Sequence, residues 1–247
     1  MRFIFVAMVL LMAPLAPAGA AVEQHRGIYL LAEAPFAGPL KALAPAQALA
    51  KIREALDLIY RKSPLSARMI DHLLDVGTVS VQYDPQHAEN SLVENRLAMF
   101  RTETGDPAID GRTPLTFVAV LGRQVLNRDA DELAGTIVHE LAGHGTQHRI
   151  GRLARMSDND RECEARLFQL AAWQDLGVPQ RASFVVQFRR SLEQAYCLDF
   201  RVWMKRRNHA LASGFDRIEI EPVELVTAFR DYIDMVLGRK PPTSADW

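Results

Sequence analysis

Apolar side chains recur at helical spacing in the first third of the chain. Between 45 and 62 they follow one another at steps of three and four residues: Leu49, Ile52, Leu56 and Ile59. This period predicts an amphipathic helix. Pro45 opens it, since proline suits the first helical position. A second, shorter helix is expected to follow Pro64 and to end at Gly77.

Alternating or continuous apolar runs predict several strands. The stretch TVSVQYD (78–84) alternates apolar and polar residues, which is typical of a half-buried strand. The run LTFVAVLG (115–122) predicts a second strand with a strong apolar character. Short strands are also indicated by GIYLLAE (27–33) and RLAMFRTE (96–103). Apart from the second of these, the residues from 84 to 114 are rich in turn formers.

Helical patterns dominate the second half of the chain. Asp129 is predicted to cap a helix, with Glu132 completing a capping box. Ser157 is predicted to cap the next helix, which stops at Gly177. A single long helix with a buried aromatic stripe is expected after it, formed by Phe184, Phe188, Leu192, Tyr196, Phe200 and Trp203. A last helix is expected over 222–237, before a loose tail.

These elements predict an α+β fold that is mostly helical, with a small β-sheet before the helix that starts near Asp129. Of the 247 residues, 49% are apolar and 24% are charged, which is typical of a globular protein. One domain over 21–247 is long enough to bury a core. The formal net charge of −1 gives no electrostatic reason to expect nucleic acid as a partner.

The first twenty residues predict export. Arg2 is followed by an apolar run and then by the small residues of AGA at 18–20. This is the pattern of a signal peptide over 1–20 that is cleaved near Ala20. We therefore expect a periplasmic or secreted protein without a membrane span after cleavage. In such a compartment Cys163 and Cys197 either form a disulfide or remain two buried thiols.

The stretch HELAGHGTQH (139–148) carries candidate metal ligands. His139 and Glu140 begin a zinc signature, but His144 follows at five residues instead of four. In a regular α-helix the two imidazoles would lie ~140° apart, too far around the helix for one ion. A single π-type turn at 141–143 restores a common face. The alternative is that Gly143 and Gly145 end the helix and leave His144 and His148 in a surface turn.

The motif HELAGH resembles the H-E-x-x-G-H motif of the dipeptidyl peptidase III family of zinc peptidases. RECEAR (161–166) is similar to that family's later E-E-C-R-A-E motif, although Arg166 stands where the family has an acidic residue. The shorter spacing between the two motifs is closer to compact members of the gluzincin superfamily. The resemblance implies a zincin-like fold, a Zn²⁺ ion held by His139, His144 and Glu162, and Glu140 as the base that activates water.

Further polar residues are candidates for supporting roles. Glu162 and Glu164 lie ~200° apart on a helix, so only one of them faces the ion, and Glu162 shares its face with the small Ala165. Candidates for substrate-side, oxyanion-stabilising or outer-shell roles are His148, Arg149, Glu164, Tyr196 and His209.

The predicted function is an exported zinc metallopeptidase that acts on peptides or proteins, with peptide substrate added along the edge of the strand at 115–122. The alternatives are a non-catalytic exported binding protein with the same fold, or a zinc hydrolase that cleaves a non-peptide amide. Glu140 favours catalysis over mere binding, because it has no ligand role in this scheme.

Overall fold

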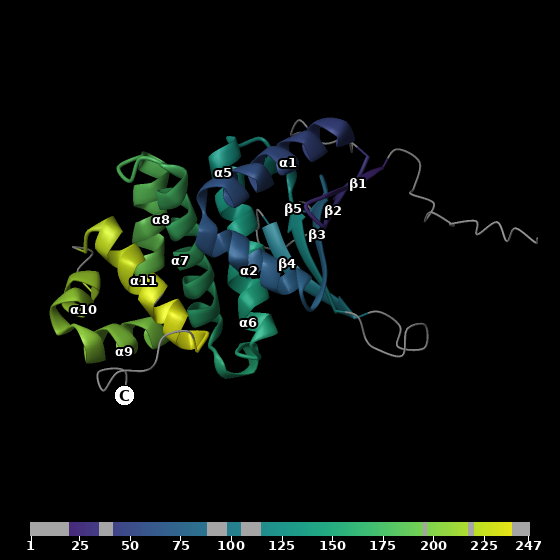
Figure 1. The fold of residues 1–247 in the computed structure, drawn as a ribbon. Coiled ribbons are helices and arrows are strands. Elements are labelled where there is room, and N and C mark those ends of the chain that lie inside the picture. Colours follow the sequence, from purple (N-terminus) through teal and green to yellow (C-terminus); the bar gives the residue numbers. More distant parts are fainter. Residues whose placement is uncertain are drawn as a thin grey trace, which may run out of the picture.

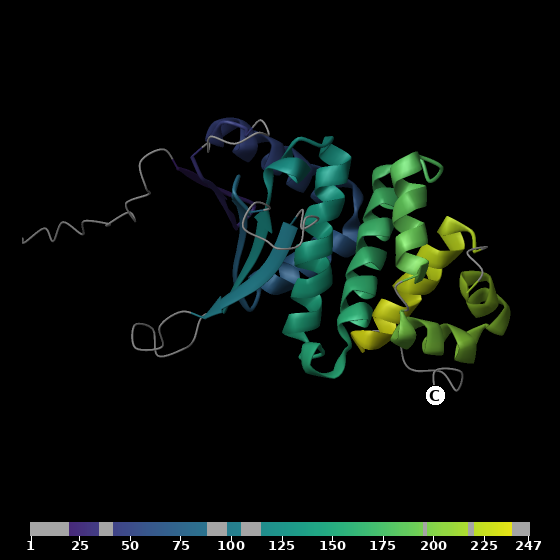
Figure 2. The same ribbon diagram turned by 180° about the vertical axis from the view of Figure 1, so that it is seen from behind.

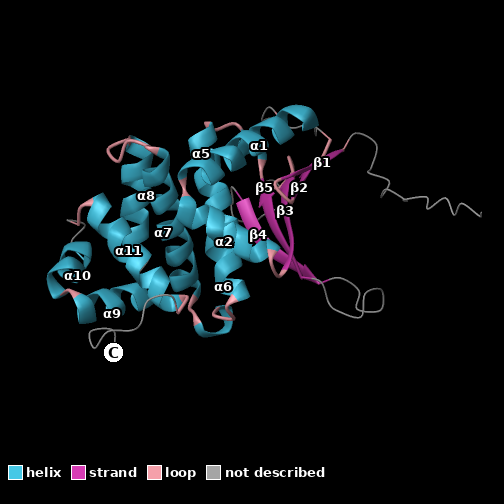
Figure 3. Ribbon diagram, viewed as in Figure 1, coloured by secondary structure: helices cyan, strands magenta, loops and turns pink. Residues whose placement is uncertain are grey.

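The computed structural model describes residues 20–34, 42–87, 98–104, 115–194, 197–216 and 220–238. A small β-sheet occupies one end of the molecule, and helices fill the remainder (Figure 1). The same division is plain when the elements are coloured by type (Figure 3). The mixed, largely helical architecture with its sheet ahead of the His-bearing helix confirms the predicted fold at this level.

The described part of the sheet has five strands in the order β1-β2-β3-β5-β4. Their bounds are β1 Ala21–His25, β2 Ile28–Ala32, β3 Gly77–Tyr83, β4 Ala98–Thr104 and β5 Leu115–Leu121. Strands β2, β3 and β5 run parallel, while β1 and β4 are antiparallel to their neighbours at the two edges. The four predicted strands are therefore confirmed, and β1 is an addition.

The expectation that the strand at 115–122 offers its edge to a peptide is wrong. Strand β5 lies inside the sheet, where Val118 pairs with Ser80 on one side and Arg101 on the other. The reason is burial on both faces, since Val118, Ala119 and their neighbours are almost fully buried. The edge of the sheet next to β5 is formed by β4, whose charged Arg101 and Glu103 suit an edge.

Two helices from the first half of the chain pack against the sheet. They are α1 (Pro45–Lys62) and α2 (Pro64–Leu74). All four apolar residues that predicted α1 are buried. They pack in one core with alternate residues of the central strands: Ile28, Leu30, Ala32, Val79, Val81, Tyr83, Phe117, Ala119 and Leu121. The sequence period and the packing therefore agree in this part of the fold.

A run of helical segments follows the sheet. It comprises α4 (Arg123–Leu126), α5 (Ala130–Ile137), the π-helix η1 (Val138–Gly145), α6 (Thr146–Arg149), the short 3₁₀-helix η2 (Leu153–Arg155) and α7 (Asp158–Leu176). The cap of α7 is confirmed, because the Ser157 hydroxyl accepts a hydrogen bond from the Asp160 N–H at 3.1 Å. Its end is also confirmed at Gly177, which adopts a φ of +83°.

The predicted capping box of α5 is not formed. Asp129 stands at the N-cap position, but its side chain makes no capping hydrogen bond. The N–H of Glu132, which the box assigns to Asp129, donates instead to the Asp131 carboxylate at 2.9 Å. Glu132 itself turns to Arg128, 3.4 Å away.

Four helices form the end of the molecule that lies away from the sheet (Figure 2). They are α8 (Ser183–Gln194), α9 (Leu198–Arg207), α10 (His209–Asp216) and α11 (Pro222–Val236). The single long helix predicted from Phe184 to Trp203 is wrong, because the helical path ends before Cys197. The backbone of Cys197 has a non-helical ψ of 74°, and its sulfur forms a disulfide with Cys163 of α7. This bond ties the start of α9 to α7.

Parts of two predictions lie outside the described residues. These are almost all of the predicted signal peptide, and the tail from 239 onward. Within the described ranges, no helix combines the length and apolar character that crossing a membrane requires.

Candidate metal centre

The His-bearing segment is one continuous helix whose hydrogen-bond pattern changes midway. It passes from α5 into the eight-residue π-helix η1 and then into α6. The π-type turn predicted at 141–143 is confirmed and extends over Val138–Gly145. The alternative, that the two glycines end the helix, is wrong. In π-helical geometry residues five apart follow one another by about one turn. The rings of His139 and His144 accordingly lie 5.0 Å apart between centroids.

Glu162 on α7 is the acidic residue that meets this histidine pair. Its Oε2 lies 3.6 Å from Nε2 of His139, and its Oε1 lies 3.4 Å from Nε2 of His144. The potential ligand atoms of the three residues all lie within 4.8 Å of one another. The side chain of Glu162 is 50% exposed, whereas those of the histidines are 13% and 14% exposed. The cluster therefore opens to solvent on the side of Glu162.

Two small residues allow α7 and η1 to come this close. A Cβ atom placed on Gly143 would lie 2.7 Å from both Cα and Cβ of Ala165. Real Cβ atoms essentially never approach other atoms so closely. Ala165 stands one turn beyond Glu162, on the face of α7 that was predicted to adjoin the His helix. Close backbone contact at this point brings the Glu162 carboxylate within reach of both imidazoles.

The donor set and its spacing fit a zinc ion. Zinc prefers imidazole nitrogen and carboxylate oxygen at ~2.0–2.2 Å in tetrahedral geometry, which separates two ligand atoms by about 3.3 Å. The carboxylate-to-imidazole distances of 3.4 and 3.6 Å are close to that spacing. Three protein ligands with solvent access are also the pattern that leaves a fourth position for water or substrate.

The charges of the cluster shift its pKa values. Hydrogen bonds to His139 and His144 lower the pKa of Glu162 well below its ordinary value. Burial by itself lowers the pKa of His144, but its hydrogen bond to Glu162 and the negative charges of Glu140 and Glu162 outweigh burial and leave that pKa raised. In the metal-free chain the Glu162 carboxylate and the protonated imidazoles thus attract one another. A bound cation would take the place of the protons between them.

Glu140 lies beside the cluster but is turned into the protein. It is 5% exposed, and burial raises its pKa, against the opposing effect of the two imidazoles. Its carboxylate also accepts a hydrogen bond from the backbone N–H of Phe100 in the edge strand β4. The ring of Phe100 contacts His144, at a centroid distance of 6.3 Å. The sequence predicts this strand but gives no signal that places Phe100 next to the site.

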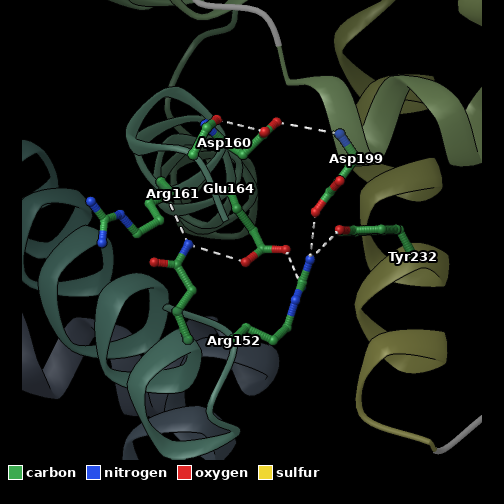
Figure 4. A network of polar contacts seen from close by, with 8 residues as sticks. Arg152, Asp160, Arg161, Glu164, Asp199 and Tyr232 are labelled. Atoms are coloured by element: carbon green, nitrogen blue, oxygen red, sulfur yellow. Dashed lines mark hydrogen bonds and ion pairs between the residues drawn. The ribbon is translucent and has the colours of Figure 1, made fainter. Parts of the chain in front are cut away.

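Glu164 faces away from the histidine pair, as its ~200° offset from Glu162 predicted. It is 5% exposed and accepts a hydrogen bond from Nη1 of Arg152 at 2.6 Å (Figure 4). Nη2 of the same arginine donates to the Tyr232 hydroxyl at 2.9 Å and to Asp199 at 3.2 Å. Burial raises the pKa of Glu164, and the charge of Arg152 opposes this shift.

The remaining candidates fall into different places. His148 is half-buried, and its ring lies 5.9 Å from that of Phe117 in the sheet. Arg149 is exposed on α6, and His209 is exposed at the start of α10, in the helical layer that α9 and α11 share. Tyr196 lies outside the described residues. Of the three described residues, His148, Arg149 and His209, none is among those that the structure gathers around His139 and His144 as potential ligands.

Comparison with known proteins adds no relative. Searches of family models, of curated proteins and of solved structures find no match to this chain. The resemblance to the gluzincin group stays with the two motifs at 139–144 and 161–166, which lie on the neighbouring helices η1 and α7.

Proposed function

We propose that this chain is an exported, zinc-dependent metallopeptidase with a zincin-like fold. One observation carries the proposal: Nε2 of His139 and Nε2 of His144 converge on the carboxylate of Glu162 within 3.4–3.6 Å. A π-helical segment is needed to produce this convergence, and such segments are frequent at functional sites. The export rests on the apolar N-terminal stretch and the small residues at 18–20.

In this proposal His139, His144 and Glu162 hold the ion. Bound zinc supplies Lewis acidity, which polarises the scissile carbonyl and acidifies water. Glu140 takes the proton of the attacking water and passes it to the leaving amine. Burial raises the pKa of Glu140, which makes its carboxylate a stronger base for the first step. The N–H of Phe100 keeps its carboxylate in place.

Strand β4 is the proposed track for the substrate. It is one of the two edge strands of the described sheet, and an extended peptide adds to such an edge through backbone hydrogen bonds. Its residue Phe100 contacts both Glu140 and His144. A peptide that follows β4 therefore passes the proposed base and the proposed ligands together.

The deciding experiment combines metal analysis with a peptide-cleavage screen on the purified chain. We expect about one zinc per chain, and Glu140→Gln retains it while turnover falls at least ~100-fold, the usual minimum for a general base. The matched control is Glu132→Gln on the preceding helix, which is expected to keep both properties.

Three results are informative in other directions. A chain that binds no zinc contradicts the metal site. A chain that binds zinc but cleaves neither peptides nor other amides is a binding protein. Cleavage of a non-peptide amide alone, with the same dependence on Glu140, retains the proposed mechanism and replaces the substrate class.

A further inference from the structure

Gln147 joins the two helices that carry the proposed ligands. It is fully buried at 0% exposure in α6, three residues after His144. Its Oε1 lies 3.1 Å from Nδ1 of His144. Its Nε2 donates to the backbone carbonyl of Arg161 at 2.9 Å and to the Glu164 carboxylate at 3.1 Å. One side chain thus contacts a proposed ligand and the residue that directly precedes another.

The amide of Gln147 has only one orientation that satisfies these contacts. The Arg161 carbonyl and the Glu164 carboxylate both accept hydrogen bonds, so the amide nitrogen must face them. In the reversed orientation an amide oxygen would face two other acceptors in a buried place, which is strongly unfavourable. The amide oxygen therefore faces His144.

This orientation determines the tautomer of His144. An amide oxygen accepts hydrogen bonds and cannot donate them, so Nδ1 of His144 must carry a proton. When the imidazole is neutral, its other nitrogen, Nε2, is then left without a proton. Nε2 is the atom that lies 3.4 Å from Glu162, at the position where a metal would bind.

We infer that Gln147 is a positioning residue for the metal centre, which selects the Nε2-binding tautomer of His144 and holds the backbone next to Glu162. The inference rests on the proposed metal site. Glu164 orients the amide, and Arg152, which also donates to the Tyr232 hydroxyl, in turn holds Glu164 (Figure 4). His139 has no such support in the described part of the chain, where its buried Nδ1 lacks a hydrogen-bond partner. Of the two histidines, His144 is therefore the one whose ring is oriented by a hydrogen bond to Nδ1.

The first test measures zinc affinity by competition with a chromophoric chelator. Gln147→Met keeps the length of the side chain but removes the amide, and we expect zinc affinity to fall about 10–100-fold, as is usual for outer partners of metal ligands. Gln180→Met is the matched control, because Gln180 also donates to a backbone carbonyl but lies at the turn between α7 and α8. It is expected to bind zinc like the unmodified chain.

The second test reads the tautomer in metal-free Glu162→Ala, which lacks the carboxylate that competes for a proton on Nε2 of His144. Nitrogen NMR of labelled histidine, at a pH where the ring is neutral, is expected to show the proton of His144 on Nδ1, with the signals assigned through His144→Ala. In Gln147→Met both tautomers should appear. The spectrum recorded with Gln147 present needs no variant at that position, so this test remains decisive if Gln147→Met fails to fold.

Two outcomes overturn the inference: a folded Gln147→Met chain with unchanged zinc affinity, or a proton on Nε2 of His144 in metal-free Glu162→Ala. Neither outcome depends on peptide cleavage. Absence of zinc binding by the unmodified chain would instead contradict the proposed function, while the tautomer measurement would still report on Gln147.

Discussion

Glu162 and Glu164 are two residues apart on α7, yet they lie in opposite environments. Glu162 is half-exposed, faces two imidazoles, and has a pKa lowered by its hydrogen bonds to them. Glu164 is buried, faces one guanidinium and one amide, and has a pKa raised by burial. Both carboxylates are paired with cationic or hydrogen-bond-donating groups, but only Glu162 offers its oxygens to a site that solvent can enter.

The difference indicates a division of labour along one helix. A half-exposed carboxylate gives little stability, since exposed ion pairs contribute at most about 1 kcal/mol. Removing a buried carboxylate costs much more stability, because its largely buried cationic partner is left without a counter-charge. We therefore expect Glu162 to matter for the metal, and Glu164 to matter first for the fold and only through Gln147 for the metal.

The largest effect on stability is expected when the Glu164 carboxylate is removed and the result is compared with removal of Glu162. Glu164→Ala should lower the free energy of unfolding by about 3–5 kcal/mol, because the half-buried Arg152 and the fully buried amide of Gln147 both lose a partner. Glu162→Ala should change it by less than about 1 kcal/mol. Zinc affinity should follow the reverse order, with a loss above ~100-fold in Glu162→Ala, beyond the range for outer partners. Denaturant unfolding and chelator competition on both variants measure this, and equal effects in either assay would contradict the division.

The next effect concerns the disulfide beside these residues. Cys163, between Glu162 and Glu164, is bonded to Cys197 across a sequence separation of 34 residues. Closing a loop of this size stabilises a protein by about 3–4 kcal/mol on the chain-entropy account. Cys163→Ala combined with Cys197→Ala should lose that amount in denaturant unfolding and keep zinc. Loss of zinc without loss of stability would mean that the bond serves the metal site instead.

A smaller effect is expected at the contact between η1 and α7. Gly143→Ala places a methyl group 2.7 Å from Ala165 and should cost about 1–3 kcal/mol, with weaker zinc binding, because the helices must separate. Adding Ala165→Gly should restore part of both losses. Gly214→Ala in α10 is the matched control, since its nearest contact lies at 3.7 Å and alanine favours helix. A neutral Gly143→Ala would show that the helices are not held at this distance.

The smallest effect is a pH dependence of the metal-free chain. The hydrogen bond to Glu162 and the nearby negative charges raise the pKa of His144 above the ordinary histidine value of 6.5 in the folded state. A raised folded-state pKa adds stability below the unfolded-state pKa, and this stability is lost as pH rises through the folded-state value. The metal-free chain should therefore lose up to about 1 kcal/mol on the alkaline side of 6.5, a limit taken from exposed ion pairs.

Zinc reverses this trend, because it binds neutral imidazole and its contribution to stability rises with pH. Thermal unfolding with and without zinc, over about pH 5 to 9, measures both slopes. A metal-free chain whose stability rises through this range would contradict the raised pKa of His144.

Local features of the chain could be predicted well from the sequence. The apolar stripe of α1, the Ser157 cap and the Gly177 stop all depend on residues within a few positions of one another. The π-type turn was predicted for the same reason, because two histidines five apart share a face only if the helix widens. The offset between Glu162 and Glu164 likewise follows from helix geometry alone.

Only the tertiary structure decided which distant groups meet. The order of the strands made β4 an edge strand and brought the Phe100 N–H to Glu140. The bond between Cys163 and Cys197 ties the start of α9 to α7, where the periodicity alone had predicted one long helix. Gln147 carries a weak local signal, one turn after His144, but its other partners lie 14 and 17 residues away on α7. Periodicity encodes hydrogen bonds within an element, whereas contacts between elements depend on how their buried faces pack, and the linear pattern does not contain that information.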